Sequence, residues 1–553
     1  MFDEIFYHGL RLVFIVLGIV VIGRYILAIV EDYTIRRRFA ISHGTQAAKD
    51  ATRGIGIRDF YQTAVALKND TLLQFMFENH RKVEAMTFLG SLLGTKNIVT
   101  CDPENIKAVL ATNFSDFVLG QRSVAFEPTL GRGIFTLDGT GWSHSRALLR
   151  PQFARSQVSD TAMFEQHVER LIAALPRSSN VACDIQKLFF RFTLDAATDF
   201  LFGESVDSLR LAEQTLDDKQ DLPPPAISPK SGDRKRSISK ARMTVLGYDT
   251  SKQGFAAAFN EAQMHITFRV LLQGFSWIYS PPSYRRANMT VHNFVDYYVN
   301  RALENYQLGK STETIAKRYV FLDALVQDTQ DPQTLRDQLL NILLAGRDTT
   351  ALLLSAAIMY ISRDSSLYRK LRQVILDRFG SKPGTPGKMP MTFENLKSTI
   401  LLRNVLNETL RLCPSVPQNF RIACRDTVLP RGGGSDESAP LVVRKGQYVF
   451  YSVYVLQRWP EIWGDDADMF RPERWDALKG QINWEFVPFN GGPRICLGQQ
   501  FALTEAGYTL ARLAQTFESV SCADPNPEEY PKIRAFLTSS LVGGVNVKLK
   551  FAS

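Results

Sequence analysis

The sequence predicts a mainly α fold with a minor β part (α+β), preceded by a single N-terminal transmembrane helix. Apolar residues recur with helical spacing along most of the chain, whereas short strand-like runs are confined to 428–455 and 536–551. The stretch 12–30 is almost wholly apolar. With 553 residues, of which 45% are hydrophobic and 22% charged, the chain can form one large helical unit.

The apolar stretch from Leu12 to Val30 is about 19 residues long, enough to cross a bilayer core as a helix. Arg24 lies in its last third, where its side chain can reach the headgroups. A basic cluster, 36–38, follows, and positive charge favours the cytosolic side. A cleaved signal peptide is the alternative, but the segment before the stretch is not basic and no A-x-A site follows. We therefore expect an uncleaved anchor with the body in the cytosol.

We expect three parts: an anchor (1–35), a polar connector (36–68) and a catalytic domain (69–553). A segment at 216–243, rich in proline and basic residues, has the composition of a mobile insertion in that domain. The stretch 430–434, Pro-Arg-Gly-Gly-Gly, is typical of a turn between short strands. Helical patterns dominate from Phe255 to Leu303 and from Leu322 to Ile361, where an apolar helix covers about Leu335–Ile361. Periodicity also predicts helices at Met163–Leu175, Asp184–Phe202 and Gln499–Leu513.

The chain carries a formal net charge of +9. Because the basic residues are spread along the sequence and no zinc-finger spacing occurs, we expect no nucleic-acid binding. A membrane surface or an acidic protein partner fits the charge better. The six cysteines form no CxxC pair, so a disulfide scaffold is excluded.

One cysteine has unusual neighbours. Cys496 lies in the loop 489–498, Phe-Asn-Gly-Gly-Pro-Arg-Ile-Cys-Leu-Gly, directly before a predicted helix. Glycines permit a tight loop and the close approach of a flat ligand, and backbone N–H groups can temper the charge of a thiolate. Arg494 can reach an acidic group on the same ligand. A shielded thiolate suits the axial position of a haem iron, where it favours O–O cleavage.

This loop resembles the F-x-x-G-x-R-x-C-x-G motif of the cytochrome P450 family, and every fixed position matches. The resemblance implies the cytochrome P450 fold, haem b (iron protoporphyrin IX) as cofactor and monooxygenase activity. By the same resemblance Cys496 is the iron ligand, Phe489 packs near the thiolate and Arg494 pairs with a haem propionate.

A second motif, Ala-Gly-Arg-Asp-Thr-Thr at 345–350, interrupts a long apolar helix. Gly346 costs about 1 kcal/mol of helix stability relative to alanine, and such a local violation is expected at a functional site. Thr349 can hold a water or dioxygen, and Asp348 can feed protons from solvent. In the family this acid–alcohol pair lies on the helix that crosses the distal haem face. A back-bonding threonine beside a surface aspartate is the alternative.

Glu408 and Arg411 are three residues apart on a predicted helix and share one face. Alone they indicate a solvated surface pair. They match the family's E-x-x-R pattern, however, and Arg474 lies in a matching stretch, 470–475. The resemblance implies a buried charge network behind the haem, which is structural rather than chemical.

Trp142 and Arg146 share a helix face and match the family's W-x-x-x-R element, so both side chains would reach a haem propionate. Arg421 falls where the family often places another propionate partner, on a strand lining the pocket. A surface aromatic–cation pair is the alternative for Trp142 and Arg146.

Several stretches are similar to the fungal branch of the family that hydroxylates n-alkanes and fatty acids at the chain end. That branch is anchored in the endoplasmic reticulum membrane with its catalytic domain in the cytosol, and takes electrons from NADPH–cytochrome P450 reductase. The chain departs from it in lacking a proline cluster after the anchor and in the length of the insertion. The similar stretches are Phe135–Gly139, Leu149–Phe153, Phe259–Gln263, Leu429–Gly434 and Tyr451–Tyr454.

The best expectation is hydroxylation of the terminal carbon of an n-alkane or fatty acid with O2. A tailoring oxidation in polyketide, fatty-acyl or terpenoid biosynthesis remains an alternative. A haem-thiolate isomerase needs no proton relay, so the intact Asp348–Thr349 pair argues against it. The anchor and the complete relay argue against a non-catalytic haem-binding protein.

Overall fold

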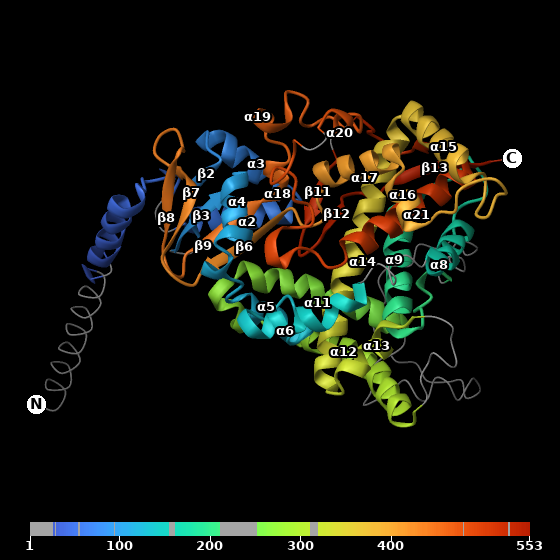
Figure 1. Ribbon diagram of the computed structural model, residues 1–553, viewed down its shortest axis with the longest axis horizontal. Helices are drawn as coiled ribbons and strands as arrows, with labels where there is room; N and C mark the ends of the chain where they lie inside the picture. The colour runs from blue at the N-terminus through green and yellow to red at the C-terminus, as the bar shows by residue number, and fades with distance from the viewer. Residues whose placement is uncertain are drawn as a thin grey trace, which may run out of the picture.

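The computed structural model describes residues 26–27, 29–52, 56–92, 95–153, 161–210, 252–309, 319–478, 481–528 and 531–552. Helices dominate and the strands form small sheets, as the sequence predicts. Figure 1 shows β2, β3 and β9 gathered at one end of the molecule and the long helices at the other. The longer helices are α2 (Ile57–Lys68), α3 (Leu72–Val83), α5 (Arg122–Leu130), α6 (Gly139–Leu149), α8 (Thr161–Ala173), α9 (Ile185–Phe202), α11 (Lys252–Leu271), α12 (Pro282–Gln307), α13 (Phe321–Asp328), α14 (Pro332–Arg363), α15 (Ser365–Phe379), α17 (Ile400–Leu412) and α21 (Gln499–Thr516).

Shorter helical segments connect these helices and shape the loops between them. They are α4 (Pro103–Lys107), η1 (Ala108–Thr112), η2 (Phe114–Asp116), η3 (Arg150–Phe153), η4 (Gln273–Ile278), α16 (Phe393–Lys397), α18 (Val453–Leu456), α19 (Pro460–Trp463), α20 (Arg474–Ala477) and η6 (Gly492–Arg494).

The largest sheet has six strands in the order β1-β2-β3-β9-β6-β4, and the next has the order β10-β13-β5. Two hairpins, β7-β8 and β11-β12, stand apart from them. The strands are β1 (Lys49–Asp50), β2 (Thr87–Leu92), β3 (Thr95–Thr100), β4 (Phe117–Val118), β5 (Ala182–Asp184), β6 (Gln418–Ala423), β7 (Thr427–Gly433), β8 (Ala439–Val443), β9 (Tyr448–Ser452), β10 (Phe517–Cys522), β11 (Ile533–Ala535), β12 (Ser539–Leu541) and β13 (Asn546–Phe551).

Helix α14 is the centre of the fold. It begins at an N-cap, Asp331, whose carboxylate accepts the backbone N–H of Thr334 at 2.9 Å, and it has proline at the first position. Its first half packs in one hydrophobic cluster and its second half in another, so that 345–350 lies where the two clusters meet. Among the described residues, α14 is the one helix long and apolar enough to cross a membrane, and most of it is buried inside the protein.

The prediction of a turn at 430–434 was wrong. Strand β7 continues to Gly433, and the pairing with β8 shifts register between Leu429 and Gly433. Pro430 falls within this bulge, where a residue without a backbone N–H is tolerated. The chain reverses after the bulge, between β7 and β8.

The stretch 36–68, expected as a connector, is largely folded. Residues 29–43 are helical, β1 pairs with β2 in the main sheet, and α2 follows. Figure 1 shows the N-terminal helix projecting from the sheet end of the body. Arg444 ties it there, because its guanidinium lies 3.0 Å from both Asp32 and Asp426. Most of the expected anchor and the whole insertion at 216–243 lie outside the described residues.

Candidate functional site

The cysteine loop lies between α20 and the start of α21 and contains η6. The backbone N–H of Cys496 donates to the carbonyl of Phe489 at 3.0 Å, which closes the loop and holds these two residues together. Residue 490, an asparagine, has a φ of +63°, which the tight reversal requires. Cys496 and Phe489 both line one large cavity of about 970 Å³.

The glycines of this loop make room for protein neighbours. A Cβ on Gly492, which has a φ of +64°, would lie 1.9 Å from the carbonyl oxygen of Leu110. A Cβ on Gly491 would lie 2.5 Å from the ring of Trp484. The tight loop predicted from the sequence is therefore present, but at these two positions the close approach is to the chain and not to a ligand.

Cys496 is below the outer surface of the protein, and the exposed part of the residue faces the cavity. Burial within the protein raises the pKa of this thiol, while a hydrogen bond from the Gly498 backbone N–H and the charge of Arg146 lower it. These two groups favour the thiolate, which is the form that binds a metal.

Arg494 is fixed on the next part of the loop. It donates to the carboxylate of Asp138 at 2.8 Å and to the carbonyl of Leu137 at 3.0 Å. Its guanidinium carbon lies 4.4 Å from the centre of the Trp142 ring, and that of Arg146 lies 5.8 Å from the same ring. Both guanidinium groups therefore lie near the Trp142 ring, and all three side chains line the main cavity.

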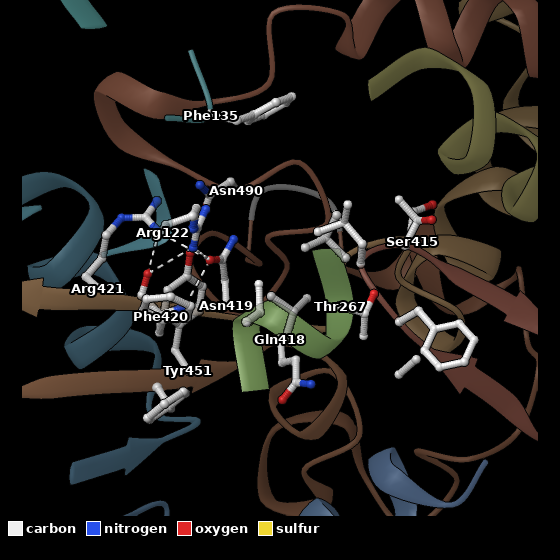
Figure 2. A pocket seen from close by; sticks show the side chains of 18 of the residues that line it. Arg122, Phe135, Thr267, Ser415, Gln418, Asn419, Phe420, Arg421, Tyr451 and Asn490 are labelled. Carbon is white, nitrogen blue, oxygen red and sulfur yellow. Dashed lines mark hydrogen bonds between the residues drawn. The ribbon is translucent and has the colours of Figure 1, made fainter. Parts of the chain in front are cut away.

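Arg421 lies on β6 and is 3% exposed. It donates to the carbonyl of Phe420 at 2.7 Å. Arg122, on α5, donates to the same carbonyl and to the side-chain oxygen of Asn419. Figure 2 shows Arg122 and Arg421 side by side, joined through Asn419 and Phe420. Arg122 was missed in the sequence, because it belongs to no recognisable motif.

The arginines of the cavity lack matching acids. Among the described residues, Asp138 is the one acid paired with this group, through Arg494. Burial, followed by the charge of Arg421, lowers the pKa of Arg122 to about 9 and that of Arg494 to about 10. Cations crowded in this way stabilise an anion placed between them. A haem carries two propionate carboxylates and an iron that accepts a thiolate, so the residues present fit this group.

The distal wall of the cavity is the middle of α14. Ala345, Gly346 and Thr349 line it, and a Cβ on Gly346 would meet no atom outside its own helix within 4 Å. The hydroxyl of Thr349 donates to the carbonyl of Ala345 at 2.7 Å, which leaves its oxygen free to accept a hydrogen bond. Ser415 donates to the carbonyl of Thr349 at 3.0 Å and steadies this turn.

Asp348 and Thr349 are adjacent on α14, but their side chains line different cavities. Asp348 is 7% exposed, so it is no surface aspartate, and it lines a second cavity of about 690 Å³. Its carboxylate accepts the hydroxyl of Thr538 at 3.1 Å and lies 3.5 Å from the guanidinium of Arg347. The two residues expected as an acid–alcohol pair thus face two adjacent cavities.

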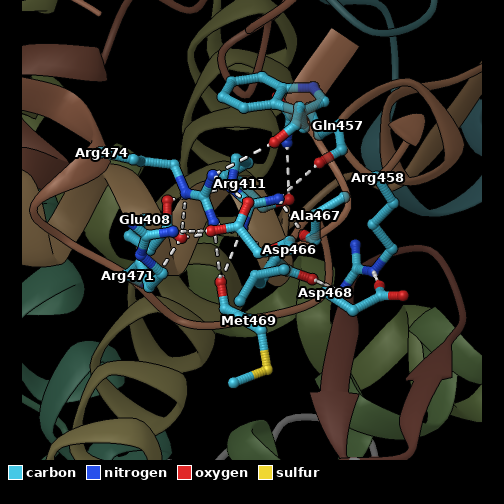
Figure 3. A network of polar contacts seen from close by, with 12 residues as sticks. Glu408, Arg411, Gln457, Arg458, Asp466, Ala467, Asp468, Met469, Arg471 and Arg474 are labelled. Carbon is cyan, nitrogen blue, oxygen red and sulfur yellow. Dashed lines mark hydrogen bonds and ion pairs between the residues drawn. The ribbon is translucent and has the colours of Figure 1, made fainter. Parts of the chain in front are cut away.

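Glu408, Arg411 and Arg474 form one network (Figure 3). Glu408 and Arg411 are fully buried, and Arg411 contacts the carboxylate through two nitrogens at 2.8 and 2.9 Å. Arg474 donates at 2.8 Å and the indole of Trp475 at 3.0 Å. Such geometry allows a buried carboxylate to stay charged. The sequence missed Trp475 as a partner.

Comparison with known proteins gives a consistent result. Residues 60–542 match the family model of cytochrome P450. The chain is 47% identical over 487 residues to cytochrome P450 52A5 of Candida maltosa, covering 87% of this chain and 86% of the relative. It is 47% identical over 486 residues to cytochrome P450 52A12 of Debaryomyces hansenii, covering 87% of each. Cytochrome P450 52A9 of Candida maltosa is 42% identical over 558 residues, covering 99% of this chain and 100% of the relative.

Proposed function

The chain belongs to the cytochrome P450 family, and we propose that it hydroxylates the terminal carbon of an n-alkane or a fatty acid. It is a haem-dependent oxidoreductase, a monooxygenase. Haem, when bound, supplies the iron at which O2 is activated so that one oxygen atom enters a C–H bond. Electrons come from NADPH through a flavoprotein reductase.

We infer that Cys496 supplies the thiolate to the iron, with Phe489 packed beside it. Arg494, Arg421, Arg146 and the indole of Trp142 would hold the propionates, because they line the same cavity and Asp138 is the one acid paired with these arginines among the described residues. Arg122 would also contact a propionate, because it lines the same cavity. Arg494, Arg421 and Arg122 are already held by hydrogen bonds to the protein, so binding through them costs little reorganisation.

The substrate proposal is carried by one observation, the character of the cavity beyond Cys496. The same cavity is also lined by apolar side chains of α2 and α3, among them Leu67, Leu72 and Phe75. A long apolar passage that begins at the thiol suits a flexible hydrocarbon chain whose end approaches the iron. The resemblance of the sequence to fungal n-alkane and fatty-acid hydroxylases supports the same class.

The test is turnover by the full-length, haem-loaded protein with its reductase and NADPH in lipid vesicles. A series of n-alkanes and fatty acids is offered beside polyketides and terpenoids, and mass spectrometry locates the oxygen. We expect hydroxylation at the chain end. Product from a polyketide or terpenoid alone would replace this proposal by a biosynthetic tailoring role, for which the cavity offers no particular support.

We further propose that the N-terminal segment anchors the enzyme in the endoplasmic reticulum membrane, with its catalytic domain in the cytosol. The described end of the N-terminal helix supports this, because its aliphatic side chains have little protein cover. A variant lacking residues 1–30 should be released from membranes by carbonate extraction, whereas the full chain should stay bound. Retention of both would contradict the anchor. The aliphatic residues are Ile26, Leu27, Ile29 and Val30, which are 54%, 69%, 51% and 55% exposed.

A further inference from the structure

A thin wall separates the main cavity from the second cavity. Thr267, Phe536, Leu537 and Thr538 line both of them. Two of these side chains are apolar and block the passage of charge. The other two carry hydroxyl groups, which can take part in a hydrogen-bonded path.

The two hydroxyls have different partners. Thr267 donates to the carbonyl of Gln263 on its own helix, at 3.2 Å. Thr538 lies at the tip of the β11-β12 hairpin and donates to the carboxylate of Asp348 at 3.1 Å. Asp348 belongs to the wall of the second cavity and Thr538 to the walls of both, so this hydrogen bond leads from one cavity toward the other.

The second cavity communicates with solvent. Lys187 and Arg534 line it, and their side chains are 81% and 42% exposed. Its other charged groups are Asp184 and Asp348. Lys187 lies 3.6 Å from Asp184, and Arg534 lies 2.8 Å from Asp70, so both of these cations have acids of their own. Asp348 is paired within α14, with Arg347 at 3.5 Å.

We propose that Thr538 is a positioning residue for proton delivery, holding Asp348 at the wall and linking its carboxyl to the main cavity. A proton from solvent enters at the Asp348 carboxyl by way of the second cavity. Once protonated, the Asp348 carboxyl donates to Oγ1 of Thr538, and the Thr538 hydroxyl turns away from Asp348 and gives its own proton to a water in the main cavity. One proton crosses the wall, and Asp348 takes up another from solvent. The hydroxyl of Thr538 thus serves the monooxygenase reaction from outside α14, and the proposal rests on that function.

The test compares Thr538→Val, which keeps the shape of the side chain, with Thr538→Ser, which keeps the hydroxyl. We measure product formed per NADPH consumed, peroxide released, and the ratio of rates in H2O and D2O. The valine variant should lower product per NADPH by about tenfold, which is less than the roughly 10²–10⁴-fold of a direct general acid or base, and raise the solvent isotope effect. The serine variant should stay close to the parent protein. Any compound that stimulates NADPH consumption serves, so failure of the alkane proposal leaves this test intact.

A double-mutant cycle with Asp348→Asn tests whether Thr538 acts through Asp348. In the Asp348→Asn background the valine substitution should cause no further loss. A crystal structure of Thr538→Val should show the Asp348 carboxylate turned away from residue 538, whose hydroxyl it accepts at 3.1 Å in the parent protein. Ser540→Ala is the matched control, because Ser540 lies on the same hairpin and lines only the second cavity. Unchanged coupling in Thr538→Val, or losses that add independently to those of Asp348→Asn, would overturn the proposal.

Discussion

The carboxylate of Asp138 lies 2.8 Å from the guanidinium of Arg494. The same carboxylate accepts the backbone N–H groups of Leu119 and Gly120, at 3.0 and 3.1 Å. Asp138 therefore fixes both the arginine of the cysteine loop and the segment that leads into α5. It is one of the residues that the sequence did not reveal as part of the site.

We expect Asp138→Asn to weaken haem retention. The amide cannot match the charge-assisted bonds of the carboxylate, each of which is worth about 1.5–3 kcal/mol. The measurement is haem bound per protein after gel filtration, with the free energy of unfolding recorded in parallel. Asp436→Asn, in an exposed loop, is the control. Full retention in Asp138→Asn would show that Arg494 needs no such support.

Glu408→Gln should destabilise the protein by about 3–5 kcal/mol, because Arg411 and Arg474 would stay buried beside a neutral amide. Denaturant unfolding measures this loss, and the absorbance of bound haem shows whether the cofactor is still incorporated. Glu473→Gln is the matched control, since Glu473 is 53% exposed and pairs with Lys370 on the surface. Equal effects of the two substitutions would contradict a structural role for the network.

Gly346→Ala should separate stability from activity. Alanine favours a helix by about 1 kcal/mol over glycine, and the new methyl group would meet open cavity. The midpoint of thermal unfolding should therefore rise while turnover of long-chain substrates falls. Gly507→Ala on α21 should raise the unfolding midpoint without lowering turnover, because its Cβ would make an ordinary contact with Leu402 at 3.7 Å. Undiminished turnover in Gly346→Ala would mean that substrate does not approach this part of α14.

Glu505 on α21 lines the main cavity and is 2% exposed, and burial raises its pKa from 4.5 to about 8, against a lowering by its hydrogen bond with Thr350. Between those two values the folded protein holds a proton that the unfolded chain has lost. The contribution of Glu505 to stability is therefore complete below pH 4.5 and declines as the pH rises toward 8, by about 1.4 kcal/mol per unit.

Glu505→Gln should remove this decline. The difference in free energy of unfolding, variant minus parent, should therefore increase as the pH rises from 5.5 to 8, and denaturant unfolding at several pH values in this range measures it. Glu518→Gln, whose carboxyl lies on the surface beside Lys550, should run parallel to the parent. Parallel curves for Glu505→Gln would show that Glu505 is ionised in the folded protein.

The sequence predicted the long helices well, since helical periodicity is a local signal, although α14 begins at Pro332, three residues before the predicted Leu335. It predicted Cys496, Arg494, Trp142 and Arg146 as neighbours because each lies in a recognisable motif, and they do line one cavity. The bulge in β7 was hidden, because a Pro-Arg-Gly-Gly-Gly run looks like a turn whether or not the strand continues around it.

Contacts between distant segments could not be predicted. Arg122 and Asp138 join the site only because α5 and the start of α6 fold against β6 and the cysteine loop. Asp348 faces a different cavity from Thr349 because the β11-β12 hairpin packs against it. Thr538 of this hairpin, which contacts Asp348, is 190 positions further along the chain. Adjacent residues on a helix point in different directions, but the sequence does not say what each of them meets.

The most direct test is the absorbance spectrum of the reduced, CO-bound full-length protein, with Cys496→Ser as the paired variant. Thiolate ligation by Cys496 predicts a red-shifted Soret band in the parent protein and its loss in the serine variant, with haem bound in both samples. An unshifted band in the parent, or a red-shifted band that survives the serine substitution, would contradict Cys496 as the iron ligand.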